Sequence, residues 1–213
     1  MVDSTRGEQY DDDHIMSRTP NSHKAATHER IVEVAARAIR RNGYAGVGVA
    51  DVMKEAGLTH GGFYAHFESR DALLVEALER ASQESVEIVT RLAQEQAAKG
   101  MSAFRSFVEA YLAEWQLGSP DSGCPVAALG CEMPRQSQIV REASAIRVQR
   151  LIAGVRATLP KSHRAAASVI AGTLVGSLQL ARALGNNAEG RAVLSTARNS
   201  LIRQYDVAPE SKH

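Results

Sequence analysis

Apolar residues recur at helical spacing along most of this chain, and the pattern is most informative between Val49 and Phe67. The first half of this stretch places its apolar residues on one helical face, and these are Val49, Val52, Met53 and Ala56. Gly57 is expected to end that helix, because glycine adopts a left-handed conformation readily. Thr59 is positioned to cap a second short helix, on which Phe63 and Phe67 form an apolar stripe. Two short helices joined by a glycine turn are typical of a helix-turn-helix, whose second helix lies in the DNA major groove.

Helical patterns also precede and follow this motif. A helix is expected from residue 22 or 27 to residue 42, and Ser69 is expected to begin a long helix that ends near residue 97. The apolar stripe of the long helix is continuous, so one helix should connect the motif to the remainder of the chain. The other helices are expected at about residues 101–115, 125–133, 135–158, 161–184 and 189–205. With no strand signal longer than a few residues, the sequence predicts an all-α fold of about nine helices.

The motif and its flanking residues resemble the TetR family of one-component bacterial repressors. The resemblance runs from about residue 27 to residue 74, and it rests on the glycine turn, the Phe63-Tyr64 pair, Phe67 and a basic residue, Arg70, three positions later. It implies a homodimer that binds a palindromic double-stranded DNA operator and releases it when a small-molecule effector enters the C-terminal domain. It also implies a transcriptional regulator that is not an enzyme and that uses no cofactor.

The chain is expected to divide into a disordered arm at residues 1–21, a DNA-binding domain at residues 22–70, and a ligand-binding and dimerisation domain at residues 71–207. Its 25 basic and 24 acidic residues are nearly balanced, so the total charge does not by itself favour DNA binding. Residues 1–16 carry five acidic residues against one basic residue, and residues 17–72 carry eight basic against six acidic residues. This weak basic footprint means that affinity for DNA should depend on geometry and dimer pairing as much as on charge.

The resemblance assigns DNA contacts to eight positions: Gly48, Thr59, His60, Gly61, Gly62, Tyr64, His66 and Arg70. Thr59 and the backbone N–H groups at the start of the second helix should meet a phosphate, and Tyr64 and Arg70 occupy phosphate-binding positions of the family. Gly61 and Gly62 each disfavour a helix by roughly 1 kcal/mol relative to alanine, and we expect them to permit close approach to the duplex. His60 and His66 are expected to contact a base edge or a phosphate. Gly48 stands where relatives have a hydroxyl residue, so a phosphate contact is expected to be absent there.

Aromatic residues gather on one face of the helix expected at 101–115, and they are Phe104, Phe107, Tyr111 and Trp115. They form either ordinary core or the wall of an effector cavity. Cys124 and Cys131 are seven residues apart and should face the same side of the next short helix, so both are added to the expected pocket.

Cys124 also raises an alternative, a thiol-based redox or electrophile sensor on the same scaffold, because a helix N-terminus lowers a thiol pKa. The competing interpretation is a buried small hydrophobe. A cysteine hydrolase pairing Cys124 with His163 lacks a third catalytic group, and no cysteine and histidine spacing indicates a metal site. A non-regulatory interaction protein is the remaining alternative, and absence of salt-dependent DNA binding would favour it.

Small residues are concentrated in the helix expected at 161–184, and small residues let helix backbones approach closely. In the resembled family the last two helices of each subunit pair across a two-fold axis as a four-helix bundle. The resemblance therefore implies a dimer interface at Ala171, Gly172, Val175, Gly176, Leu178 and Leu201. No stretch reaches the roughly 18 consecutive apolar residues of a membrane span, and the N-terminus is acidic and unlike a signal peptide, so a cytoplasmic protein without membrane association is expected.

Overall fold

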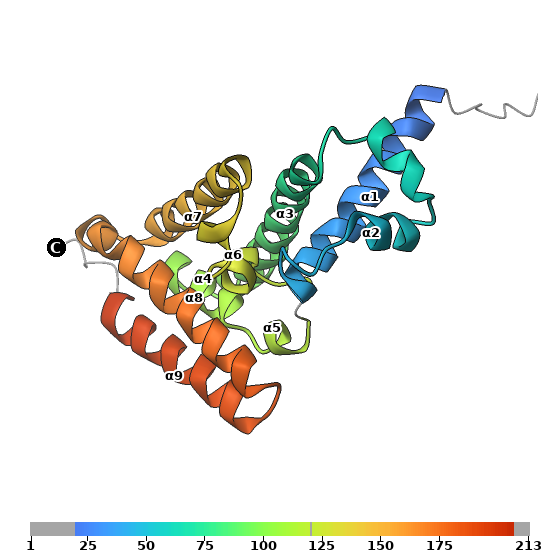
Figure 1. The fold of residues 1–213 in the computed structure, drawn as a ribbon. Coiled ribbons are helices and arrows are strands. Elements are labelled where there is room, and N and C mark those ends of the chain that lie inside the picture. Colours follow the sequence, from blue (N-terminus) through green and yellow to red (C-terminus); the bar gives the residue numbers. More distant parts are fainter. Residues whose placement is uncertain (1–19, 120, 207–213) are drawn as a thin grey trace, which may run out of the picture.

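The computed structural model describes residues 20–119 and 121–206, and every regular element in these ranges is helical. Helices α1 (Pro20–Asn42) and α2 (Val49–Glu55) and the 3-10 helix η1 (His60–Ala65) form one end of the molecule, which we call the head (Figure 1). The all-α prediction is confirmed for the described residues. The arm expected at residues 1–21 lies outside them, except that its last two residues begin α1.

Glycines end the first two helices of the head, as the sequence predicts. Gly43 follows α1 and Gly57 follows α2, and both have a φ of 71°, in the left-handed region that glycine tolerates. Between the helices lies a continuous core, whose largest fully buried side chains are Ile31, Ile39, Tyr44, Met53 and Phe63. The glycine turns therefore fix the angles at which the helices bury their apolar faces against each other.

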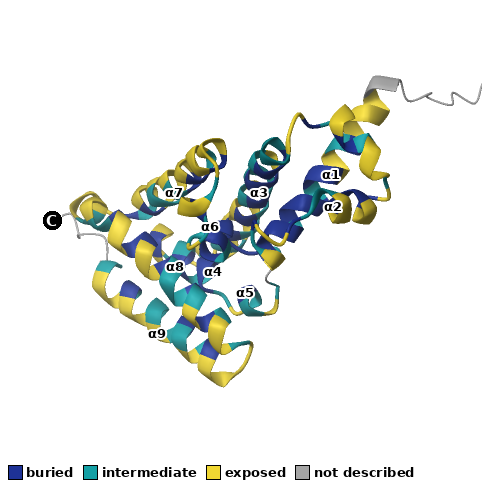
Figure 2. Ribbon diagram, viewed as in Figure 1, coloured by how far each residue is buried: buried dark blue, intermediate teal, exposed yellow. Residues whose placement is uncertain are grey.

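Helix α3 (Arg70–Ala97) connects the head to the rest of the molecule, as predicted. Ser69 caps it, because its Oγ accepts a hydrogen bond of 3.1 Å from the backbone N–H of Ala72. In Figure 1, α3 lies between α1 on one side and α7 on the other. Its buried residues lie between Leu73 and Val89 (Figure 2). A displacement of α3 would therefore change its packing against both groups of helices.

Charged side chains connect α1 to α3. Arg40 is buried and donates hydrogen bonds to the carbonyl oxygen of Ala81 at 3.1 Å and to Glu84 at 2.6 Å. Arg80 on α3 pairs with Glu29 at 3.2 Å and Glu33 at 2.6 Å, both on α1, and with Glu84 at 3.0 Å. Arg40 lies at the C-terminal end of α1, where its charge complements the helix dipole, and its side chain also reaches across to α3.

The C-terminal part of the molecule contains the remaining elements: α4 (Ala103–Tyr111), α5 (Trp115–Gly118), α6 (Pro125–Leu129), η2 (Met133–Arg135), α7 (Gln138–Thr158), η3 (Lys161–Ala166), α8 (Ala167–Leu184) and α9 (Ala188–Tyr205). Two expected helices are shorter than predicted. The helix expected at 101–115 breaks at Leu112, where the backbone leaves helical geometry, and the helix expected at 125–133 ends at Leu129. Apolar spacing continues across both breaks, which explains why the spacing alone did not predict them.

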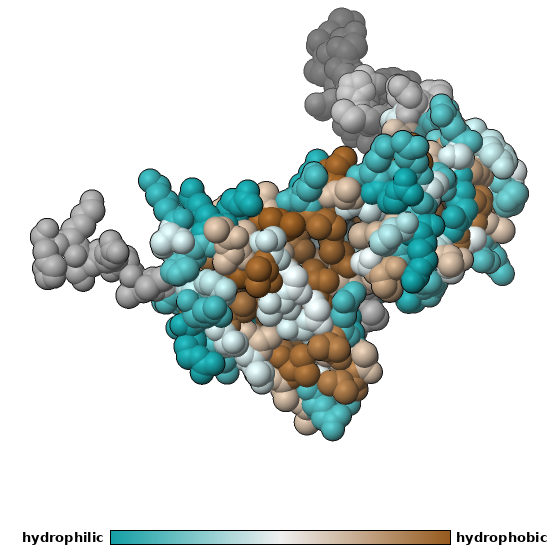
Figure 3. Space-filling view, turned by 60° about the vertical axis from the view of Figure 1, so that its left-hand side comes forward, coloured by the Kyte–Doolittle hydropathy of each residue, from teal (hydrophilic) through white to brown (hydrophobic). Residues whose placement is uncertain are grey.

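Helices α8 and α9 form an antiparallel pair on the outside of the C-terminal part, joined through Gly185 with a φ of 94° (Figure 1). Figure 3 shows broad apolar surface on the C-terminal part of the molecule. Among the described residues, the helix Lys161–Leu184 is the one segment whose length and apolar composition would suit a membrane span. Core helices of soluble proteins meet the same criteria, and the pairing of α8 with α9 agrees with that simpler explanation.

Candidate nucleic-acid interface and effector cavity

The outer face of the head is formed by η1. Phe63 and Phe67 are buried and stack against each other, with ring centroids 5.5 Å apart. The neighbouring Tyr64 is 73% exposed and meets only the edge of Phe63. Thr59, His60 and Gly61 are also exposed on this face. Phe63 and Phe67 therefore anchor η1 to the core, while Tyr64 and the residues at the start of η1 face solvent.

The second helix of the motif is a 3-10 helix and not the α-helix that the sequence predicted. Thr59 occupies the N-cap position with extended backbone angles, as expected, but its side chain makes no capping hydrogen bond. That hydroxyl is therefore not used to complete the helix. In this conformation the side chain is suited to meet a phosphate together with the N-terminus of η1.

The two glycines of η1 are not required by the interior of the protein. A Cβ atom added to Gly61 would have no other atom within 4 Å, and one added to Gly62 would lie 3.6 Å from Cε of Met53, an ordinary contact. Neither glycine has a positive φ. Within the described residues, neither the packing nor the backbone conformation therefore requires glycine at these two positions.

Gly48 is the N-cap of α2, with φ −85° and ψ 139° and no side-chain capping bond. Asp51, in the first turn of α2, lies close by, because a Cβ atom on Gly48 would stand 3.1 Å from Oδ2 of Asp51. The Asp51 carboxylate complements the helix dipole at this end. It also places a negative charge beside the N-cap position.

Two of the predicted DNA-contact residues are turned toward the protein. Arg70 donates through Nε to the carbonyl oxygen of Val47 at 3.1 Å, and through Nη2 to the carbonyl oxygen of Tyr44, so it fastens the loop after α1 to the start of α3. His66 is half-buried, with its ring centroid 6.1 Å from that of His28 on α1. Either residue would have to give up these contacts within the protein to contact DNA. The spacing of residues in the sequence does not indicate such inward contacts.

His66 has an unusual environment for a histidine. Its Nδ1 is buried and has no hydrogen-bond partner in the described part of the chain. Burial, and then the nearby charges of His28 and Lys24, lower the pKa of His66 below its ordinary value. The ring is therefore held in its neutral form more strongly than an exposed histidine would be.

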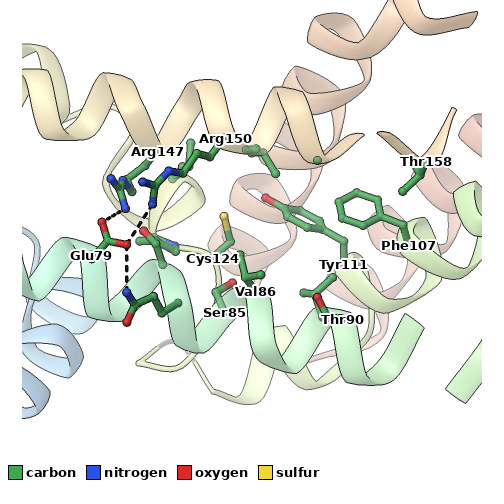
Figure 4. A pocket seen from close by; sticks show the side chains of 17 residues that line it. Glu79, Ser85, Val86, Thr90, Phe107, Tyr111, Cys124, Arg147, Arg150 and Thr158 are labelled. Atoms are coloured by element: carbon green, nitrogen blue, oxygen red, sulfur yellow. Dashed lines mark hydrogen bonds and ion pairs between the residues drawn. The ribbon is translucent and has the colours of Figure 1, made fainter. Parts of the chain in front are cut away.

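A cavity of about 510 Å³ lies between α3, α4, α7 and the start of α6 (Figure 4). Phe107, Tyr111 and Cys124 line it, as the sequence predicted. Phe104, Trp115 and Cys131 do not. Phe104 packs against Tyr205 with ring centroids 6.2 Å apart, Trp115 begins α5 beyond the break in α4, and Cys131 is exposed beyond the end of α6.

One end of the cavity is charged, a feature that the sequence analysis did not predict. Glu79 on α3 pairs with Arg147 on α7 and lies 3.1 Å from Arg150, and Gln83 donates to it at 3.2 Å (Figure 4). Phe107 and Tyr111 lie at the opposite end, with Cys124 between the two ends. A sequence signal was present, because the buried positions of α7 are Val140, Ser144, Arg147 and Val155. An arginine on an apolar stripe indicates a buried charge that needs a partner.

Cys124 lies above a buried polar network. Its backbone N–H donates to Oε1 of Gln116 at 3.3 Å, and Arg182 donates to the same oxygen at 3.2 Å. The hydroxyl of Tyr111 is buried without a hydrogen-bond partner in the range that the structure covers. Burial and then the neighbouring Cys124 raise the pKa of Tyr111 well above its ordinary value, so the phenol is neutral. Both cysteines are free thiols, and no group of three metal-ligating side chains occurs among the residues described.

The residues implied for a dimer interface divide into two sets. Ala171, Leu178 and Leu201 are buried inside the chain itself, so they cannot form the outer surface of α8 and α9. Gly172 and Gly176 border open space, and Val175 is half-buried. The exposed apolar residues of α8 are Val169, Leu180 and Leu184. The six implied interface residues therefore include residues of both the inner and the outer faces of α8 and α9.

The sequence profile of the tetR family of bacterial regulatory proteins matches residues 31–77, which include the helix-turn-helix. One curated relative, the uncharacterized HTH-type transcriptional regulator YerO of Bacillus subtilis strain 168, is 37% identical over 51 residues. The matched segment is 24% of this chain and 18% of that protein, so the chain spans less than a fifth of the relative's length.

Solved structures extend the likeness to the whole fold. A TetR transcriptional regulator from Chloroflexus aurantiacus J-10-FL has a TM-score of 0.66 at 22% identity, with 85% of this chain and 96% of that chain covered. The reduced form of E. coli NemR has a TM-score of 0.70 at 21% identity, with 87% and 99% covered. The profile match places a helix-turn-helix, a DNA-binding motif, in the head. Residues 31–77 therefore carry the tetR-type helix-turn-helix sequence, and the fold of most of the chain is similar to that of solved TetR-family regulators.

Proposed function

We propose that this protein is a ligand-responsive transcriptional repressor that binds a palindromic operator as a homodimer. One observation carries the proposal: η1 presents Tyr64 to solvent while Phe63 and Phe67 hold the helix from beneath. An exposed tyrosine offers a flat apolar ring and a hydroxyl group that can donate a hydrogen bond to a phosphate oxygen. Thr59, His60 and the two glycines beside it complete a face suited to the backbone and base edges of a major groove.

Dimer formation is supported by the outer face of α8. Val169 and Leu180 are 65% and 63% exposed, and Gly172 and Gly176 between them border open space. A second copy placed against this face would bury the exposed apolar side chains, and the glycines would let the helices approach closely. Two heads arranged by this contact would meet successive major grooves about one helical turn apart.

Ligand response is supported by the cavity, because α3 supplies one of its walls and also begins at the head. A small molecule that favours a different position of α3 would change the spacing of the two heads. The resulting loss of operator affinity equals the ligand's preference between the two states.

A thiol sensor on the same scaffold is the second candidate. Cys124 lines the cavity beside Tyr111 and Arg182, whereas Cys131 is exposed and distant from the cavity. A small electrophile or oxidant that enters the cavity would therefore meet Cys124. The test measures release of the operator after treatment with an oxidant. Release that is lost in Cys124→Ser and retained in Cys131→Ser would establish this alternative, and equal release in both variants would exclude it.

The proposed function is tested by fluorescence anisotropy with a labelled duplex from the region upstream of the protein's own gene. We expect binding that weakens steeply with salt. Tyr64→Phe should lower the affinity about fivefold to tenfold without changing the unfolding temperature, because the hydroxyl contacts DNA and not the protein. Leu180→Asp should abolish dimers and tight binding, while the matched control Ile139→Asp, on an exposed site of α7, should do neither. Salt-independent or absent binding would contradict the proposal.

A further inference from the structure

We propose that the effector is an amphipathic anion, whose negatively charged group binds Arg147 and Arg150 and whose apolar body lies toward Phe107 and Tyr111. This inference rests on the proposed role of the cavity as an effector site. It adds the chemical class of the effector, which neither the family nor the resemblance supplies.

The charged end of the cavity has more cationic than anionic groups. Two guanidinium groups share the single carboxylate of Glu79, and no other charged side chain lines the cavity. Arg147 is only 8% exposed, and its Nε is buried without a hydrogen-bond partner in the described residues. A buried guanidinium with an unused donor is unfavourable unless a further acceptor arrives. A carboxylate or sulfonate would supply that acceptor and balance the remaining positive charge.

The opposite end of the cavity suits an apolar body. Phe107 and Tyr111 are joined there by the aliphatic side chains of Val89 and Leu151 along the walls. The Tyr111 phenol stays neutral because burial raises its pKa, so it supplies no negative charge against a ligand. Its hydroxyl is available as a second, neutral hydrogen-bond partner. The lining is therefore apolar along most of its length, with its cationic groups concentrated at one end.

An anion bound at the charged end would also affect the contact between α1 and α3. A ligand that takes the donors of Arg147 and Arg150 releases Glu79, which would then carry an uncompensated charge. The next residue, Arg80, already pairs with Glu29 and Glu33 on α1. Glu79 faces α7 and Arg80 faces α1, so a ligand that changes the partners of Glu79 would act on the head through a shift of α3 itself.

The test uses two fluorescent probes of closely similar shape, 8-anilinonaphthalene-1-sulfonate and N-phenyl-1-naphthylamine, which differ by the sulfonate. We expect the purified folded protein to bind the sulfonate at least tenfold more tightly, as a charge-assisted hydrogen bond implies. Arg150→Gln should reduce that preference at least fivefold. Arg156→Gln is the matched control, because Arg156 is exposed on α7 and does not line the cavity.

Glu79→Gln should have the opposite effect and tighten sulfonate binding severalfold, because the competing carboxylate is removed. Equal affinity for the two probes, or a preference that survives Arg150→Gln unchanged, would overturn the inference. Operator binding is measured separately on the same samples without a probe. Intact operator binding with no preference for the anion rejects the inference alone, whereas a clear anion preference with no operator binding rejects the proposed function alone.

Discussion

The hydroxyl of Tyr44 lies 3.2 Å from Oγ of Ser144, so the loop after α1 is hydrogen-bonded directly to α7, a wall of the cavity. The backbone N–H of Tyr44 also donates to Oε2 of Glu132, just before η2, at 2.9 Å. Tyr44 is fully buried. This contact therefore attaches the head to the C-terminal part in addition to the ion pairs between α1 and α3.

Tyr44→Phe removes the hydroxyl of this contact and should lower the free energy of unfolding by about 1 kcal/mol. Ser144 retains its own hydrogen bond to the carbonyl oxygen of Val140 at 2.7 Å, so it is not left unsatisfied. Ser144→Ala should cause a similar loss, and the double variant should lose less than the sum, as expected for two groups in contact. Chemical denaturation measures all three, and strictly additive losses would contradict the hydrogen bond.

Local features of the head were predictable because they depend on neighbours in the sequence. Gly57 ends α2, Ser69 caps α3, and the spacing of Phe63 and Phe67 leaves Tyr64 exposed. Each of these follows from a spacing of three or four residues or from the backbone freedom of glycine. The 3-10 form of η1 was not predictable in the same way, because a single short turn satisfies either helical geometry.

Long-range contacts were not predictable from local spacing. Tyr44 and Ser144 are 100 residues apart, and Arg147 meets Glu79 across 68 residues. Periodicity assigns a residue to a helix face but does not identify the helix that covers that face. For the same reason Ala171 and Leu178 were assigned to an interface between subunits although they pack inside their own chain.

Gly61→Ala should change stability and DNA binding in opposite directions. The added methyl group meets no other atom and the backbone has no positive φ, so the free energy of unfolding should rise by about 0.4–1 kcal/mol. Operator affinity should fall at least fivefold, because the added methyl group would prevent the close approach of the duplex to the backbone at this position. Thermal unfolding and anisotropy are compared on one sample. A variant that is more stable and binds DNA as tightly as the parent would show that Gly61 has no part in recognition.

Gly48→Thr should strengthen operator binding severalfold by supplying a hydroxyl group that caps α2 and reaches a phosphate. The new Cβ would lie 3.1 Å from the exposed carboxylate of Asp51, which can move aside by a few tenths of an ångström. Gly48→Ala is the matched control, because it adds the Cβ without the hydroxyl. If the threonine variant binds the operator no more tightly than the alanine variant, the proposed phosphate contact is contradicted.

Acidification should destabilise the head through His66. The pKa of His66 is lowered in the folded protein, so below about pH 6.5 the unfolded chain binds this proton more readily than the folded chain does. Stability should therefore fall as the pH decreases through that value toward the lower folded pKa, and be unaffected by His66 above it. His66→Gln should reduce the slope of stability against pH in this window relative to the parent protein. An unchanged slope in this variant would argue against a half-buried, neutral ring.

Selection of bound sequences from a random duplex library by the purified full chain tests the central claim most directly. The account predicts enrichment of an inverted repeat whose two half-sites are about one helical turn apart, bound by paired subunits. Tyr64→Ala should abolish the enrichment while leaving the protein folded. Recovery of no sequence, or of a single half-site bound by one subunit, would contradict the account.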